Sequence, residues 1–209
     1  MLKLACPSCG GEVNFRSKTS VFAVCTFCKS NLIRTDLDLE TFGEMGELRE
    51  DSSPIQLGTR GKFNGTWFDV VGRVKVSWSD GNWNEWYLYF EDGRAGWLAD
   101  AAGEFAINFA TDQHNAPALE AIATETSVEL EKNTYTVSDI KEITCAGSEG
   151  ELPFKALKGR KSTSVDLLDS DENFASIEYS EDEGILAFTG KYVELDSLNA
   201  QNLKQFEDW

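Results

Sequence analysis

Histidine, positive charge and long apolar runs are all scarce in this chain of 209 residues. His114 is the single histidine, which excludes His-based catalytic triads and metal sites built from several imidazoles. No segment approaches the ~18 consecutive apolar residues of a membrane-spanning helix, and the first residues contain no apolar signal region. We therefore expect a cytoplasmic protein without a membrane span.

The scarcity of Lys and Arg gives the chain a formal net charge of −17. Generic binding to nucleic acids or anionic membranes depends on basic side chains that displace counterions from phosphates, so this charge opposes both. Residues 1–34 differ, because they hold five basic side chains against Glu12 alone, which leaves +4 there and −21 in the remainder. The first segment is predicted to be a separate electrostatic unit.

Four of the five cysteines form two Cys-x-x-Cys pairs, Cys6/Cys9 and Cys25/Cys28, with 15 residues between the pairs. This spacing is typical of a zinc ribbon, in which four thiolates leave the ion no open position and make it structural rather than catalytic. Bound metal would supply on the order of 10 kcal/mol to a segment too short to fold alone. A redox dithiol is the alternative, although it needs only one pair. Cys145 is expected to be a small buried hydrophobe.

The densest strand signal lies between Trp78 and Leu98, where Asp80-Gly81 and Asp92-Gly93 predict the turns of a three-stranded meander. A two-residue loop at the second turn fixes the pairing of the strands and therefore the side on which each residue lies. One side is predicted to form the core: Trp86, Leu88, Phe90 and Trp97. Trp83 and Tyr87 lie on the other side, which is either covered as well or left for a partner.

The whole pattern predicts a mainly β protein with a tetracysteine zinc ribbon and two small antiparallel modules, SH3-like or barrel-like. The expected divisions are a ribbon over 1–35, an acidic linker over 36–53, a first module over 54–110, a connector over 111–127 and a second module with its tail over 128–209. Faint similarity between the modules indicates either a degenerate duplication or hairpins that resemble one another by composition. The tail from Leu198 is predicted to form a short amphipathic helix with Leu203 and Phe206.

A candidate binding surface combines aromatic side chains with the polar residues around the loop Gly147–Pro153 and the basic cluster after it. Its members are Trp83, Tyr87, Glu149, Glu151, Lys155, Lys158, Arg160 and Lys161. The carboxyl groups of this loop, with Asp166, offer an alternative as acid or base of an enzyme. No nucleophile elbow, phosphate loop or cofactor fingerprint accompanies them.

Four stretches resemble a known bacterial family: LGTRGKFNGTWFDVVGRVKV, WNEWYLYFEDGRAGWL, GELPF and IEYSEDEG. The family is DUF4178, and the resemblance covers roughly Ser53 to the C-terminus. Its members often carry an N-terminal zinc ribbon like that of Cys6 to Cys28. The resemblance implies no established activity, only an accessory role near membrane-associated or polyamine-related systems.

Three functions are consistent with these patterns. The favoured hypothesis is a non-catalytic adaptor or binding protein with a protein partner, in which the ribbon and the β modules are recognition units. The second is an enzyme that uses the acidic residues of Gly147–Pro153. The third is a nucleic-acid-associated factor that acts through the basic ribbon, against which the acidic remainder counts.

Overall fold

The structure is a computed structural model that describes residues 1–45, 48, 51–111, 116–171 and 173–206. The described chain is built almost entirely from antiparallel strands, as predicted. The cysteine unit contains β1 (Leu2–Ala5), β2 (Glu12–Phe15), β3 (Phe22–Val24), β4 (Ser30–Thr35) and β5 (Asp38–Glu44). The rest contains β6 (Arg60–Phe63), β7 (Thr66–Trp78), β8 (Gly81–Phe90), β9 (Ala95–Ala101), β10 (Glu104–Thr111), β11 (Ser127–Leu130), β12 (Asn133–Leu152), β13 (Lys161–Leu168), β14 (Asn173–Ser180) and β15 (Gly184–Val193). The two 3₁₀ helices are η1 (Leu119–Ala121) and η2 (Leu195–Leu198), and no helix among the described residues is long and apolar enough to cross a membrane.

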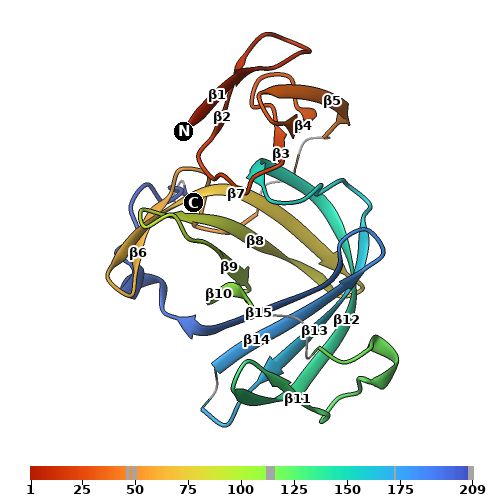
Figure 1. The fold of residues 1–209 in the computed structure, drawn as a ribbon. Helices are drawn as coiled ribbons and strands as arrows, with labels where there is room; N and C mark the ends of the chain where they lie inside the picture. The colour runs from red at the N-terminus through yellow and green to blue at the C-terminus, as the bar shows by residue number, and fades with distance from the viewer. Residues whose placement is uncertain (46–47, 49–50, 112–115, 172, 207–209) are drawn as a thin grey trace.

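Eight strands form a closed antiparallel barrel in the order β12, β13, β14, β15, β10, β9, β8 and β7, and the pairing of β7 with β12 closes the ring. In Figure 1 the barrel occupies the centre, with the cysteine unit on one side and β11 on the opposite side. Closure satisfies the backbone groups that the edge strands of an open sheet leave unpaired.

The segments 54–110 and 128–209, predicted as two modules, contribute to this one barrel. Phe109 of β10 lies opposite Thr189 of β15, and Val76 of β7 lies opposite Cys145 of β12. Alternation along a strand indicates which residues share a side, but it does not say which distant strand is the partner. The pairing of β10 with β15 and of β7 with β12 removes edges that two separate modules would have left open.

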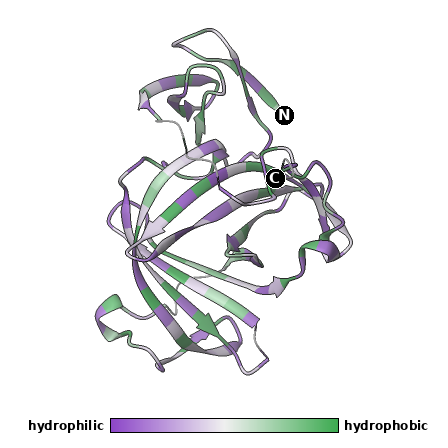
Figure 2. Cartoon of the chain, turned by 180° about the vertical axis from the view of Figure 1, so that it is seen from behind, coloured by the Kyte–Doolittle hydropathy of each residue, from purple (hydrophilic) through white to green (hydrophobic). Residues whose placement is uncertain are grey.

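Two apolar clusters lie on the outward sides of the barrel strands, and flanking segments cover them. One cluster packs Trp86, Leu88 and Phe90 beneath Ile55 and Leu198, which belong to the segments before β6 and within η2. A second cluster packs outward residues of β13 and β14 beneath β11 and the segment around η1. Hydrophobic and hydrophilic positions accordingly alternate along the strands (Figure 2). A third cluster lies partly inside the ring, where Val74, Val76, Trp97, Ile143 and Cys145 pack along the cavity, so apolar packing occurs on both sides of the barrel wall.

The three-stranded meander forms as predicted, but both turns differ from the prediction. The first turn is Ser79-Asp80 and not Asp80-Gly81, because Gly81 already pairs with Trp78, and the second turn is one residue longer than expected. The loop is 91–93, because the Phe90 N–H donates to the Arg94 carbonyl at 2.9 Å and the last loop residue has a positive φ of 87°. Tyr87 therefore lies opposite Trp97, with their ring centroids 4.9 Å apart. A one-residue shift moves a side chain to the other side of the sheet. The prediction that Trp97 shares a side with Trp86, Leu88 and Phe90 is wrong, although Trp97 is buried.

The cysteine unit is joined to the barrel through β3, which pairs with the end of β12. There the buried carboxylate of Glu151 accepts hydrogen bonds from the backbone N–H groups of Arg16 at 2.7 Å and Ser17 at 3.2 Å. The segment predicted as a linker is also held, since β5 pairs with β4 and the Asp51 carboxylate lies 2.7 Å from Lys75 Nζ. Across the described residues, the first unit is thus docked on the barrel.

Two smaller predictions differ from the structure. The stretch Gly147–Pro153, predicted as a loop, is mostly strand, because β12 continues to Leu152 and pairs with β7 and then with β3. The predicted tail helix is absent from the described residues beyond Leu198, and Phe206 is 51% exposed. Leu198 itself is buried, and His114 lies outside the described residues.

Candidate functional site: the barrel cavity and the cysteine cluster

The interior of the barrel contains a cavity of about 330 Å³, lined by residues from all eight strands. This volume lies within the range of small-molecule sites, and an eight-stranded barrel is just wide enough to hold one small ligand. Small inward side chains leave the space open: Ala99, Ala101, Ala106, Ser162, Ser164 and Ser176. The sequence therefore places short residues where larger ones would have filled the barrel.

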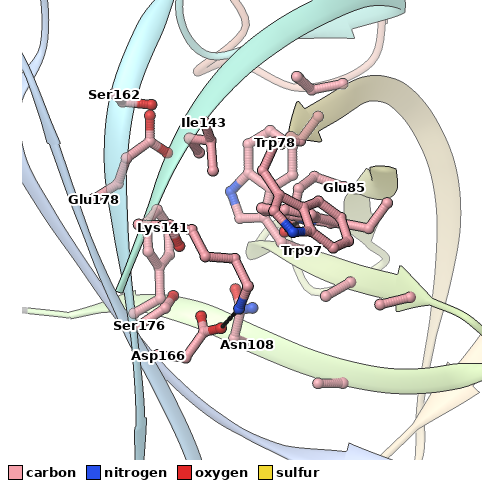
Figure 3. A pocket seen from close by; sticks show the side chains of 18 of the residues that line it. Trp78, Glu85, Trp97, Asn108, Lys141, Ile143, Ser162, Asp166, Ser176 and Glu178 are labelled. Carbon is pink, nitrogen blue, oxygen red and sulfur yellow. Dashed lines mark hydrogen bonds and ion pairs between the residues drawn. The ribbon is translucent and has the colours of Figure 1, made fainter. Parts of the chain in front are cut away.

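One wall of the cavity is aromatic. Trp78 of β7 and Trp83 of β8 pack against each other with ring centroids 5.2 Å apart, and Trp97 of β9 lies beside them. Figure 3 shows Trp78 and Trp97 next to Glu85 on one side of the cavity, with polar side chains across from them. Tryptophan faces attract apolar groups and cations alike.

The opposite wall is polar, and its two basic side chains are already paired. Lys141 Nζ lies 3.3 Å from the Asp166 carboxylate and also pairs with Asp139. Arg160 donates to Glu178 at 2.8 Å, and its side chain is only 7% exposed. Burial lowers the pKa of Lys141, but the carboxylates of Asp139 and Asp166 outweigh it and raise that pKa above the ordinary value. The two cations are therefore neutralised within the wall.

Glu85 is the acidic group on the aromatic side. Its Oε1 accepts a hydrogen bond from Trp83 Nε1 at 2.6 Å, and among the described residues no Lys or Arg forms an ion pair with it. Burial raises the pKa of Glu85 to about 8, and the negative charges of Glu178 and Asp166 add to the effect against the lowering by Trp83. Within the described part of the chain, this carboxyl group therefore has no positively charged partner.

Asn108 supplies a second unused acceptor. Its side chain lines the cavity from β10 and the residue is 4% exposed. Its Oδ1 has no hydrogen-bond donor within the described part of the chain. A buried amide oxygen without a partner costs free energy, so its position on the cavity wall suits a ligand that donates a hydrogen bond.

The four paired cysteines also form a site. Their Sγ atoms all lie within 4.8 Å of one another, with Cys6 and Cys28 at 3.7 Å and Cys9 and Cys25 at 3.7 Å. Four sulfurs at about 2.3 Å from a tetrahedral zinc ion would be separated by about 3.8 Å. The donor set and its geometry therefore fit one metal ion, as the spacing predicted.

Ionisation of these thiols also favours a cation. Hydrogen bonds from Ser30 lower the pKa of Cys28 to about 6. A Gly11 N–H lowers the pKa of Cys9, but the neighbouring thiols outweigh it and raise that pKa to about 12. Four thiolates this close repel one another, so a metal ion among them is what allows all four to ionise.

The predicted binding surface is not one surface in the structure. Trp83 lines the cavity, while Tyr87 is 2% exposed, with its hydroxyl 2.8 Å from Thr19 Oγ1 of the cysteine unit. Arg160 is a buried part of the cavity wall. The remaining basic members of the predicted cluster are exposed: Lys155, Lys158 and Lys161. Tyr87 is therefore a core residue that helps to dock the cysteine unit, because its side turned out to be covered.

The carboxyl groups predicted as an acid–base site do not converge. Glu149 lies 3.8 Å from Arg73, whereas Glu151 holds the backbone of the cysteine unit and Asp166 lines the cavity. Burial raises the pKa of both Glu151 and Asp166 above the ordinary range. Each has a separate structural environment, so the hypothesis of an enzyme at Gly147–Pro153 gains no support from this arrangement.

Comparison with known proteins identifies one matching protein family. The family model of the domain of unknown function DUF4178 matches residues 56–195. The chain belongs to this family. No curated protein and no solved structure matches it. For this DUF4178 protein, the matched region contains all eight barrel strands, the first of which is β7 and the last β15, and thus the cavity.

Sequence reasoning missed Glu85, Asn108, Lys141 and Glu178 as site residues. One signal was available for Glu85, which is a charged residue on the Trp83 side of an aromatic strand. A second was the alternation of serines in Lys161–Leu168, which places small polar groups on one side. Neither signal reveals a cavity until the barrel closes, because only closure turns that side inward.

Proposed function

We propose that this DUF4178 protein is a non-catalytic binding protein that holds a small organic molecule inside its barrel. The observation that carries the proposal is the cavity of about 330 Å³, with an aromatic wall facing a polar wall. Ligand sites combine apolar area with a few polar groups that fix orientation, and both occur here. The absence of converging carboxyl groups at Gly147–Pro153 supports binding over catalysis.

The same proposal assigns one structural zinc ion to Cys6, Cys9, Cys25 and Cys28. The sulfur separations support a closed tetrathiolate site, and Glu151 links this unit to the barrel through backbone N–H groups. Zinc would thus stabilise the docked unit and take no part in a reaction.

The test is a titration with three cyclohexyl compounds that carry an amine, a hydroxyl or a carboxylate. Binding is read by calorimetry and by the fluorescence of Trp78, Trp83 and Trp97, which line the cavity. We expect at least one compound to show saturable binding. This binding should be lost in Ala106→Leu, because Ala106 lines the cavity. It should be kept in Ala110→Leu, because Ala110 is an exposed residue of the same strand. Binding that survives Ala106→Leu would place the ligand elsewhere, and no binding by any compound would contradict the proposal.

An adaptor role is a second candidate, and a separate observation favours it. Three apolar side chains of the cysteine unit are strongly exposed: Phe27 at 69%, Leu37 at 71% and Phe42 at 55%. Exposed apolar residues can mark a protein contact. Affinity purification with the double variant Phe27→Ser and Phe42→Ser should lose a partner that the native chain captures, whereas equal recovery would contradict this role.

A further inference from the structure

We propose that the cavity selects a small organic cation, an alkylamine, whose charged nitrogen pairs with the Glu85 carboxylate beside the Trp78 and Trp83 rings. This inference rests on the proposed binding function and specifies its ligand. Four carboxyl groups line the cavity against two basic side chains: Glu85, Glu104, Asp166 and Glu178 against Lys141 and Arg160. The wall as a whole is therefore negative.

Pairing inside the wall decides which groups are left for a ligand. Lys141 is held by Asp166 and Asp139, and Arg160 is held by Glu178 at 2.8 Å and by Ser180 at 3.1 Å. An anionic ligand would meet two cations that are already paired with carboxylates, and of these two side chains only Arg160 has a buried nitrogen, Nε, without a partner among the described residues. Among the described residues, the Trp83 N–H is the hydrogen-bond donor to Glu85, which leaves most of the acceptor capacity of this carboxyl group unused.

The aromatic wall complements a cation at Glu85. The negative faces of tryptophan rings attract alkylammonium groups, and the attraction strengthens in a site from which water is excluded. Trp83 is bonded through its ring N–H to the same carboxylate that would bind the ligand. The apolar part of an alkylamine would then pack against Trp97 and the alanines of β9 and β10.

Asn108 supplies the remaining contact. Its buried Oδ1 has no donor among the described residues, so an N–H or O–H elsewhere on the ligand would satisfy it. Asn108 Oδ1 and the unused acceptor positions of Glu85 thus favour a hydrogen-bond donor with positive charge, although Arg160 Nε on the same wall also has no partner among the described residues.

Binding of a cation should release a proton near neutral pH. The pKa of Glu85 is about 8, chiefly because of burial. The negative charges of Glu178 and Asp166 in the cavity, and of Asp100 on the outward side of the sheet, add to this increase, while the hydrogen bond from Trp83 opposes it. Lys141 and Arg160 are paired with their own carboxylates. A bound ammonium group favours the ionised carboxylate. Affinity for the amine should therefore rise about tenfold per pH unit between pH 6 and pH 8 and level off above this range.

The decisive experiment compares cyclohexylamine, cyclohexanol and cyclohexanecarboxylate at pH 8 by calorimetry. We expect the amine to bind about tenfold or more tightly than the alcohol, and the carboxylate to bind worst. Glu85→Gln should bring amine and alcohol to similar affinity, whereas Glu129→Gln, which removes an exposed carboxyl group of β11 outside the cavity, should keep the preference. Proton release, measured for the native protein in buffers of different ionisation enthalpy, gives a readout that needs no variant.

The outcomes separate the two proposals. Equal binding of all three compounds, lost in Ala106→Leu, would keep the binding function and overturn cation selection. A preference for the carboxylate would also overturn cation selection. So would amine binding that releases no proton and that has the same affinity in Glu85→Gln as in the native protein. No binding by any of the three would overturn both.

Discussion

The unusual ionisation of Glu85 predicts a stability change that grows with pH. A glutamate in an unfolded chain titrates near 4.5, whereas burial raises the pKa of Glu85 to about 8 in the folded protein. Between these values the unfolded state has lost its proton while the folded state has kept it. The folded protein therefore binds more protons, and the contribution of Glu85 to stability is complete below pH 4.5 and is lost as the pH rises through 8.

The magnitude follows from the width of that interval. Each pH unit between the two pKa values costs about 1.4 kcal/mol, so the contribution lost by pH 8 is on the order of 5 kcal/mol. Glu85→Gln replaces the protonated carboxyl group with a neutral group of nearly the same shape. The variant should have nearly native stability at pH 4.5 to 5 and should exceed the native protein by several kcal/mol at pH 8 to 8.5.

Urea unfolding of both proteins at matched pH values measures this difference. Comparison at the same pH cancels the titration of groups that the two proteins share, the cysteines included. Glu129→Gln, at an exposed position of β11, controls for the loss of one negative charge. A difference between Glu85→Gln and the native protein that is constant from pH 5 to pH 8.5 would show that Glu85 ionises normally, and the account of the cavity electrostatics would fail.

Three further predictions concern the metal, the core and nucleic acids. Elemental analysis should find one zinc per chain, and Cys9→Ser should lower the metal content; unchanged content would refute the site. Leu88→Ala should lower the free energy of unfolding by about 2–5 kcal/mol, because Leu88 is fully buried. Trp83→Ala should lower the free energy of unfolding by less, because Trp83 faces a cavity. Equal losses in the two variants would contradict this prediction. Gel shifts should show no binding to generic duplex DNA near physiological salt, and salt-sensitive micromolar binding would restore the nucleic-acid hypothesis.

Local patterns predicted those parts of the structure that depend on local geometry. The two Cys-x-x-Cys pairs bring four sulfurs together because each pair forms its own tight turn. Asn64 and Gly65 both have positive φ, at 47° and 84°, and join β6 to β7 as the Asn-Gly signal predicted. In both cases the residues of the sequence motif are the same residues that form the predicted local structure.

The features of the structure that the sequence did not predict depend on pairing between strands far apart in the chain or on the length of one loop. Asp92-Gly93 was correctly predicted as a turn, but Gly93 can end either a two-residue or a three-residue loop. The three-residue loop shifts the pairing by one residue and turns Trp97 inward. Closure of the barrel depends on β10 with β15 and β7 with β12, which no local pattern marks. Glu85 therefore could not be recognised as a group inside a cavity.

The placement of the apolar clusters explains how the barrel can keep a cavity with polar walls and still fold. In most small barrels the interior is filled by side chains, so residues there serve stability first. Here Trp86, Leu88 and Phe90 pack outward beneath the segments around Ile55 and Leu198, and β13 and β14 are covered in the same way. Because these outer clusters supply apolar burial, inward positions such as Glu85 and Asn108 can keep unpaired acceptors at a cost the fold tolerates. Ala106→Leu therefore tests binding by filling the cavity, and Glu85→Gln tests it in a variant expected to be more stable than the native protein at pH 8, so a lost preference for the amine would not come from unfolding.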